Sequence, residues 1–304
     1  MSGGRHEAEG RPALERVLEA VRASLPASVD AVHLVGGAVR DLLLDRPVRD
    51  LDLVLGGPIG ASAVAAAALA GRPGWTRVAV HERFGTASLR APGDHRVDLA
   101  VARRETYPRP GALPVVEAGA TLLEDLTRRD FTIHALARPV EPGGRLGGLV
   151  DPFGGAADLA ARLLRLLHEG SLADDPTRAI RAARYAARLG LEVEPDRFAR
   201  SLERSRSAGS WTTVSGDRLR RSLEELLAEP GYREALGILG RLGVLREVHP
   251  ALDGARPDPG AAVPSSVPAR WREWLQGLRG HDRAAVAGRL RFSRALVEAV
   301  GGNP

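Results

Sequence analysis

One short segment of the chain alternates apolar and acidic residues. Leu51, Leu53 and Leu55 alternate with Asp50 and Asp52, which predicts a strand whose leucines face a core and whose aspartates share the other face. Two carboxylates about 7 Å apart on one strand face repel each other unless a cation lies between them, and Mg²⁺ prefers such oxygen ligands. The pattern therefore indicates either a metal-binding pair or two solvated carboxylates at a strand end.

The residues before this segment offer a place for an anion. An apolar strand is predicted at 32–35, the turn Gly36-Gly37 follows, and a helix begins at Ala38. Backbone N–H groups are exposed where a glycine turn leads into a helix, and Arg40 lies one turn further on. We therefore expect a phosphate site next to the carboxylate pair.

The hydrophobic pattern also divides the chain into regions. Residues 1–11 carry no periodic pattern and are expected to be disordered, and an amphipathic helix is predicted from Pro12 to Leu25. Short strands and helices alternate up to about residue 160, after which the pattern becomes helical, so we predict an α+β fold. The expected regions are an N-terminal extension and helix (1–30), a head (31–160), a helical neck (161–228) and a shortened helical body and tail (229–304).

Composition adds limits rather than a function. The chain has no cysteine, which excludes disulfides and cysteine-based zinc sites. Its formal charge is +5 and all 43 basic residues are arginine, which fits either a nucleic-acid partner or a genome-wide compositional bias. The N-terminus has no apolar signal core and the apolar run 61–71 is too short to span a bilayer, so a cytoplasmic protein without membrane association is expected.

Three groups of residues follow one another in a fixed order. The first is Gly36-Gly37-x-Val39-Arg40-Asp41 with Asp50-x-Asp52. The second is Arg128-Arg129-Asp130-Phe131-Thr132-x-His134-Ala135. The third is Asp174-Asp175-x-x-Arg178 followed by Arg181 and Arg184. Together, over roughly residues 31–250, these groups resemble the signature of the class II tRNA nucleotidyltransferases and bacterial poly(A) polymerases, with His134 where Asn is usual and Asp174 where Glu is usual.

The resemblance implies a polymerase-β-like head, with a mixed sheet and helices, followed by an all-helical neck and body. It implies that Asp50 and Asp52 are catalytic and hold two Mg²⁺ ions. Asp98, on a later predicted strand, would be a third metal ligand or else an ordinary surface aspartate. In the family, a loop in the region corresponding to 107–119 helps to choose the last nucleotide.

The same resemblance assigns nucleotide-binding roles to nine residues. Those expected to position the phosphates or the ribose are Gly36, Gly37, Arg40, Arg129 and Asp130, the last at the 2′-hydroxyl. Those expected on the helix that reads the base are Asp175 and Arg178, with Arg181 and Arg184 holding phosphates or shaping the pocket. An acceptor and a donor three residues apart match the edge of a base. A capped helix with a solvated arginine stripe explains the third group equally well.

The predicted function is template-independent addition of C, A or both to the 3′ end of tRNA from CTP and ATP, with release of pyrophosphate. Addition of CC only, addition of A only and poly(A) synthesis share these motifs and stay open. A catalytically inactive nucleotide- or RNA-binding homologue is the alternative of another class, suggested by His134, Asp174 and the short C-terminal region. No protein partner is inferred.

Overall fold

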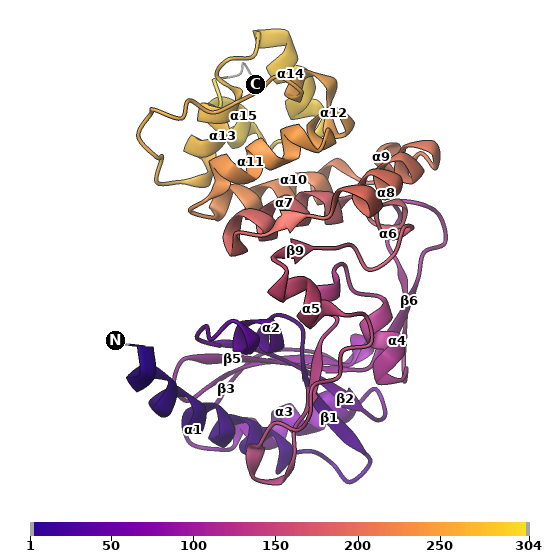
Figure 1. Cartoon of the computed structure of the whole chain (residues 1–304), viewed down its shortest axis with the longest axis vertical. Coiled ribbons are helices and arrows are strands. Elements are labelled where there is room, and N and C mark those ends of the chain that lie inside the picture. The colour runs from indigo at the N-terminus through magenta and orange to yellow at the C-terminus, as the bar shows by residue number, and fades with distance from the viewer. Residues whose placement is uncertain (1–2, 302–304) are drawn as a thin grey trace. The chain divides into compact units, whose positions relative to one another are not determined.

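The computed structural model describes residues 3–301, with side chains from Pro12 onward. The chain forms two compact units. The head unit comprises Met1–Thr106 and Pro114–Ala161, and the helical unit comprises Tyr107–Leu113 and Arg162–Pro304. Figure 1 colours the first mainly indigo and magenta and the second mainly orange and yellow. The predicted head of mixed sheet and helices followed by a helical part is confirmed.

A six-stranded mixed sheet organises the head unit, in the order β3-β4-β5-β2-β1-β8. Strands β2 and β5 are parallel, and the other neighbours are antiparallel. The strands are β1 (Ala31–Val35), β2 (Asp50–Gly56), β3 (Thr76–His81), β4 (Thr86–Ala91), β5 (His95–Val101) and β8 (Ala137–Pro139). The parallel pair lies in the middle, so the residues of β2 are flanked on both sides.

Helices α1 (Gly3–Arg22) and α3 (Ala61–Ala70) pack on the apolar face of this sheet. Leu18, Leu53 and Leu69 are buried in their shared core. Because β2 side chains alternate, the same packing leaves its acidic residues on the opposite face. The expectation of disorder in residues 1–11 is wrong for 3–11, where α1 begins at Gly3; residues 1 and 2 lie outside the described part. Arg, Glu and Ala in this segment favour a helix, whereas its three glycines do not.

The remaining head elements connect the sheet to the motifs. They are α2 (Gly37–Leu43), η1 (Glu82–Phe84), β6 (Arg103–Thr106), β7 (Val115–Ala118), α4 (Leu122–Thr127), η2 (Thr132–His134), η3 (Pro142–Gly144) and α5 (Gly155–Ala160). The region 107–119, where the resemblance places a loop, is not a loop throughout, because Val115–Ala118 is a strand paired with β6. Arg104 and Glu117 face each other across that ladder, 3.8 Å apart. The β-branched Val115 and Val116 favour a strand despite the nearby proline and glycines.

The helical unit is built almost entirely of helices. Its elements are β9 (Leu163–Leu164), α6 (Ser171–Asp174), α7 (Thr177–Leu189), β10 (Glu192–Val193), α8 (Pro195–Ser207), α9 (Ser210–Thr213), α10 (Gly216–Ala228), α11 (Tyr232–Arg241), α12 (Val244–Val248), η4 (Pro250–Leu252), α13 (Val267–Leu275), α14 (Gly280–Arg289) and α15 (Arg294–Ala299). Helix α7 packs against α10 and α11. The short parallel pair β9 and β10 is the one departure from the predicted all-helical part. No helix in the described residues is both long and apolar enough to cross a bilayer.

Candidate active site

The acidic pair lies on the exposed face of β2. Asp50 and Asp52 are exposed, while Leu51 and Leu53 between them are buried. Among the described residues, no hydrogen bond or ion pair reaches either carboxylate. Partial withdrawal from water raises the pKa of the Asp52 carboxyl; Arg129 opposes this rise, and the charges of Asp98 and Asp50 add to it. The pair is thus a patch of negative charge that no side chain of the described residues neutralises by direct contact.

A third carboxylate lies beside this pair. The parallel ladder between β2 and β5 sets Asp52 directly opposite Asp98, so both side chains project from one face of the sheet. Asp98 already has partners, since Ser88 Oγ donates a short hydrogen bond to it and Arg96 Nε lies 3.0 Å away. The structure therefore brings Asp98 next to Asp52 as predicted, and its role as a metal ligand stays a prediction.

Gly36 makes room for an arginine above the carboxylates. Its backbone has φ +69° and ψ −129°, a conformation that residues with a side chain avoid. A Cβ at this position would lie 2.7 Å from Nη1 of Arg129. Because Arg129 also lowers the pKa of Asp52 electrostatically, the glycine, the arginine and the acidic pair form one cluster.

Asp125 fixes this arginine and was not singled out from the sequence. Its side chain is fully buried, and Oδ2 accepts from Arg129 Nη2 at 3.0 Å while Oδ1 accepts from Arg128 at 2.9 Å. Burial alone would raise the pKa of the Asp125 carboxyl, but Arg128 and Arg129 outweigh burial and the net pKa is lowered. Asp125 lies on α4 and Arg129 just beyond its C-cap, and the four-residue spacing between them was the available signal.

Behind Arg129 lies a buried chain of polar side chains. Arg40 is 4% exposed, and its Nε and Nη2 each donate to a different oxygen of Asp41 at 2.9 Å. Its Nη1 lies 2.7 Å from Nε2 of His134, whose Nδ1 lies 2.8 Å from Oδ1 of Asp130. In this structure Arg40 and Asp130 therefore support one another through His134. Their direct contact with phosphate and ribose, like the phosphate contact of Gly37, stays a prediction.

The predicted base-reading residues lie together in the helical unit. Asp175 precedes α7, and its Oδ1 accepts from the backbone N–H and the hydroxyl of Thr177, at 3.0 and 2.7 Å. Nη2 of Arg218 lies 2.8 Å from the same oxygen. The N-cap position of α7 is Pro176, which makes no side-chain cap hydrogen bond, so Asp175 holds the start of the helix from one residue further upstream, through Thr177. All of these contacts involve only one of its two oxygens.

Arg178 is buried near the start of the same helix. Its Nη1 donates to Ser171 Oγ at 2.8 Å and its Nη2 to the hydroxyl of Tyr107 at 3.3 Å. Tyr107 belongs to the segment Tyr107–Leu113 of the helical unit, and Gly111 N–H in that segment donates to the carbonyl of Ala173 at 2.8 Å. The predicted loop thus packs on the helix that carries the candidate base readers.

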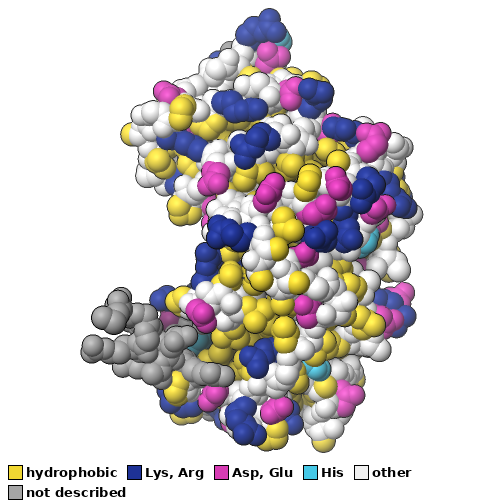
Figure 2. All heavy atoms as spheres, viewed as in Figure 1, with side chains coloured by type: hydrophobic (Ala, Val, Ile, Leu, Met, Phe, Trp, Pro, Cys, Tyr) yellow, Lys and Arg dark blue, Asp and Glu magenta, His cyan; other side chains and the backbone are white. Residues whose placement is uncertain are grey.

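Arg181 and Arg184 lie further along α7. Their guanidinium carbons lie 5.7 and 5.0 Å from the ring centre of Tyr185, and Arg184 also makes a short ion pair with Glu225. On the face shown in Figure 2, arginine side chains of the helical unit are interspersed with acidic ones. Arg184 thus has an acidic partner within the helical unit.

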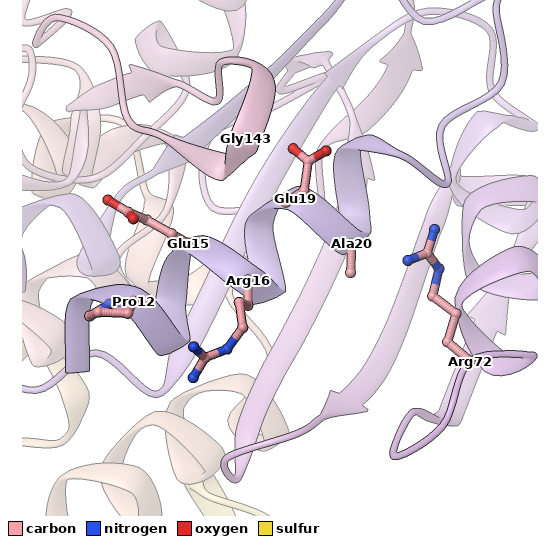
Figure 3. A pocket seen from close by; sticks show the side chains of 7 residues that line it. All are labelled: Pro12, Glu15, Arg16, Glu19, Ala20, Arg72 and Gly143. Carbon is pink, nitrogen blue, oxygen red and sulfur yellow. The ribbon is translucent and has the colours of Figure 1, made fainter. Parts of the chain in front are cut away.

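A cavity of about 410 Å³ opens elsewhere on the head unit. It is lined by Pro12, Glu15, Arg16, Glu19, Ala20, Arg72 and Gly143. Figure 3 shows the Glu19 carboxylate pointing toward the loop with Gly143 and the Arg16 side chain pointing the opposite way. Most of its lining comes from α1 and neither β2 carboxylate is among the lining residues, so it is not the candidate active site.

The fold and the acidic pair define the class of protein: a nucleotidyltransferase-type head followed by a helical unit. Residues 32–165 match the family described as the poly A polymerase head domain. Residues 32–165 therefore form a head domain of this family, and the resemblance predicted from the motifs is confirmed.

Two curated relatives and one solved structure show the extent of this similarity. The chain is 39% identical over 216 residues to an A-adding tRNA nucleotidyltransferase of Aquifex aeolicus, covering 71% of this chain and 25% of that protein. It is 41% identical over 210 residues to a CC-adding tRNA nucleotidyltransferase of Deinococcus radiodurans, covering 69% and 53%. A CCA-adding enzyme in apo form II superposes with a TM-score of 0.75 at 29% identity, covering 95% of this chain and 70% of that one. Solved complexes of similar CCA-adding enzymes contain ATP or CTP. The chain thus spans about half or less of the length of these two curated relatives.

Enzymes of this family use divalent metal ions, and the donor set on β2 fits such an ion. Two carboxylates without a protein partner are the oxygen ligands that hard cations prefer. Within the described part of the chain, no group of three His, Asp or Glu side chains could hold an ion. An ion held by Asp50 and Asp52 would therefore complete its shell with water or nucleotide oxygens, as Mg²⁺ commonly does.

Proposed function

We propose that this chain is a template-independent tRNA nucleotidyltransferase that adds C, A or both to the tRNA 3′ end from CTP and ATP. The observation that carries the proposal is the unpartnered Asp50 and Asp52 pair beside Arg129 on the exposed face of β2. The family match of residues 32–165 and the similarity to CC-adding and A-adding enzymes support it. The helical unit, rich in arginine, is the region we assign to tRNA.

The residues of the head unit account for the chemistry as follows. The terminal hydroxyl of the RNA loses its proton, its oxygen bonds to the α-phosphorus, and the bond to the β-phosphate breaks to release pyrophosphate. Asp50 and Asp52 would hold Mg²⁺, which when bound lowers the pKa of the hydroxyl and neutralises the triphosphate. Arg129, fixed by Asp125 and by the carbonyl of His134, would orient the phosphates.

Selection of the base is assigned to the helical unit. Asp175 uses Oδ1 for Thr177 and for Arg218, which leaves Oδ2 for a donor on the base. Arg178 is held by Ser171 and Tyr107, and its guanidinium supplies donors only. An acceptor and a donor fixed in this way can distinguish the edges of C and A from those of G and U.

The test supplies three tRNAs, one without its CCA end, one ending in the first C and one ending in CC, with CTP and ATP given separately. A full CCA-adding enzyme extends all three, a CC-adding enzyme extends the first two with CTP, and an A-adding enzyme extends the third with ATP. Extension of unrelated RNA by many A residues would indicate a poly(A) polymerase instead. Nucleotide binding without a metal-dependent product would support the inactive homologue and overturn the proposal.

A further inference from the structure

His134 occupies a buried position between two oppositely charged side chains. It is 7% exposed and follows Phe131, whose ring it meets edge-on at 5.6 Å. Its Nε2 lies 2.7 Å from Nη1 of Arg40, and its Nδ1 lies 2.8 Å from Oδ1 of Asp130. Asn is usual at this position in the motif that these residues resemble.

The chemistry of the two partners determines which nitrogen of the His134 ring carries the proton. A guanidinium can only donate, so Nε2 must accept from Arg40 and carries no proton. The ring proton then lies on Nδ1 and is donated to the Asp130 carboxylate. His134 is therefore neutral with one donor and one acceptor, and both are used.

The backbone of the same residue contacts a second arginine. The carbonyl of His134 accepts from Nη1 of Arg129 at 3.2 Å, and Arg129 lies over Gly36 beside the carboxylate pair. One residue thus links Arg40 and Asp130 through its ring and Arg129 through its backbone. Substitution of the side chain would remove the ring contacts with Arg40 and Asp130 and would leave the backbone carbonyl that contacts Arg129 in place.

We propose that His134 is a positioning residue for nucleotide binding, coupling Asp130 to Arg40 through its neutral imidazole. The proposal rests on the proposed function, because it concerns the nucleotide site of that reaction. A carboxamide also offers an N–H donor and an oxygen acceptor, so Asn can hydrogen-bond to both Asp130 and Arg40, although its side chain is shorter than that of His. An aliphatic side chain offers neither, and the buried groups of Arg40 and Asp130 would lose this partner.

The experiment compares His134→Leu with His134→Asn under steady-state conditions. We expect His134→Leu to raise the KM for ATP or CTP about tenfold or more, with the KM for tRNA unchanged. His134→Asn should recover most of that loss. Because Asp130 is the residue expected at the 2′-hydroxyl, His134→Leu should also weaken discrimination against deoxynucleotides.

A matched control separates positioning from loss of stability. His95 is a second buried histidine of the head unit, 8% exposed, and its side chain shares the core face of β5 with Val97 and Leu99. His95→Asn should leave the nucleotide KM unchanged even where it lowers the melting temperature. An unchanged nucleotide KM in folded His134→Leu, or a His134→Asn protein as weak as His134→Leu, would overturn the proposal.

Two further measurements cover the cases in which a variant or the activity fails. In the intact wild-type protein, nitrogen NMR of the His134 ring should show a protonated Nδ1 and an unprotonated Nε2, and any other state overturns the proposal even if His134→Leu does not fold. A wild-type protein that binds ATP but transfers nothing would refute the proposed function alone. The role of His134 would then be tested by comparing the ATP affinities of the same variants in place of their KM values. A wild-type protein that binds no nucleotide would overturn both.

Discussion

The two candidate sites treat their charged side chains in opposite ways. In the head unit, Asp50 and Asp52 are exposed and have no partner among the described residues. In the helical unit, Asp175 and Arg178 are held by Thr177, Arg218, Ser171 and Tyr107. Charge left without a partner is suited to binding an ion, whereas side chains fixed by neighbours are suited to reading a shape. In the proposed function, the first site therefore carries the chemistry and the second the selection of the base.

The formal charges of the two units also differ. The head unit has 18 arginines and 20 acidic residues, and the helical unit has 25 arginines and 18 acidic residues. The formal charge of +5 therefore comes entirely from the helical unit. Because compositional bias would apply to both units equally, this asymmetry favours a polyanionic partner for the helical unit.

The largest effect is expected from removing a carboxylate of the pair. Asp52→Ala should lower kcat for both CTP and ATP by about 10³-fold, which is the scale seen when an electrostatic group at a reacting centre is lost. Asp94→Ala is the control, because Asp94 is exposed and pairs with Arg49 at 3.3 Å. Single-turnover transfer measures the effect, and an Asp52→Ala rate near that of wild type would remove the assignment.

Asp125→Ala should have the next largest effect, mainly on folding. Removing one member of a buried ion pair costs about 3–5 kcal/mol of unfolding free energy, and Asp125 holds both Arg128 and Arg129. Asp125→Asn keeps the shape without the charge and should cost less. Urea unfolding at neutral pH measures the difference; equal stability of Asp125→Ala and wild type would contradict the role given to Asp125.

Gly36→Ala should weaken nucleotide binding by displacing Arg129. The backbone strain alone costs about 1–3 kcal/mol, and the new Cβ would approach Arg129 Nη1 to 2.7 Å. Gly119→Ala is a matched control, since Gly119 also has a positive φ of +84° but no atom lies within 4 Å of an added Cβ. Both variants should lose stability, whereas only Gly36→Ala should raise the KM for nucleotide; an equal KM in both would refute the steric explanation.

Asp175→Asn tests the other side of the comparison. Asn caps a helix nearly as well, but its amide replaces one acceptor oxygen with a donor. We expect the choice between nucleotides to relax about tenfold, the scale of one well-made hydrogen bond, with little change in melting. Thr177→Ala is the counterpart, since it removes the hydroxyl that donates to Asp175 Oδ1 and should affect melting without affecting selectivity. Reduced melting with retained selectivity in Asp175→Asn would leave Asp175 with a structural role at the start of α7 alone.

The smallest expected effect is on stability against pH. Partial burial is the main cause that raises the pKa of the Asp52 carboxyl in the folded state, and the charges of Asp98 and Asp50 add to it. Ionised Asp52 therefore destabilises the fold in the absence of metal. Asp52→Asn should therefore be slightly more stable than wild type at neutral pH. This difference in stability between Asp52→Asn and wild type should decrease as the pH falls through the folded-state pKa of Asp52. It should vanish below the pKa of Asp in the unfolded chain, about 3.9. Metal-free melting curves over this range test the sign.

Local patterns predicted much of the fold. Alternation placed the leucines and aspartates of β2 on opposite faces. Contacts between distant residues were not predictable in this way. The register that sets Asp52 beside Asp98 depends on strand pairing, which side-chain periodicity does not determine.

The supports of the candidate site were harder to predict than its motifs. Asp125 precedes an arginine pair on a short helix, where a charged residue is ordinarily solvated, yet it is fully buried. The contact between Arg40 and His134 joins residues 94 positions apart. The segment Tyr107–Leu113 leaves the head and joins the helical unit, which its proline and glycine content could not indicate.

The most direct test measures transfer of C, A, G and U in one single-turnover series with wild type, Asp52→Asn and Asp175→Asn. Loss of C and A transfer in equal proportion by Asp52→Asn, together with a higher ratio of G and U transfer to C and A transfer in Asp175→Asn, is the predicted result. A changed ratio with a retained rate in Asp52→Asn would contradict the division of chemistry and selection between the two units.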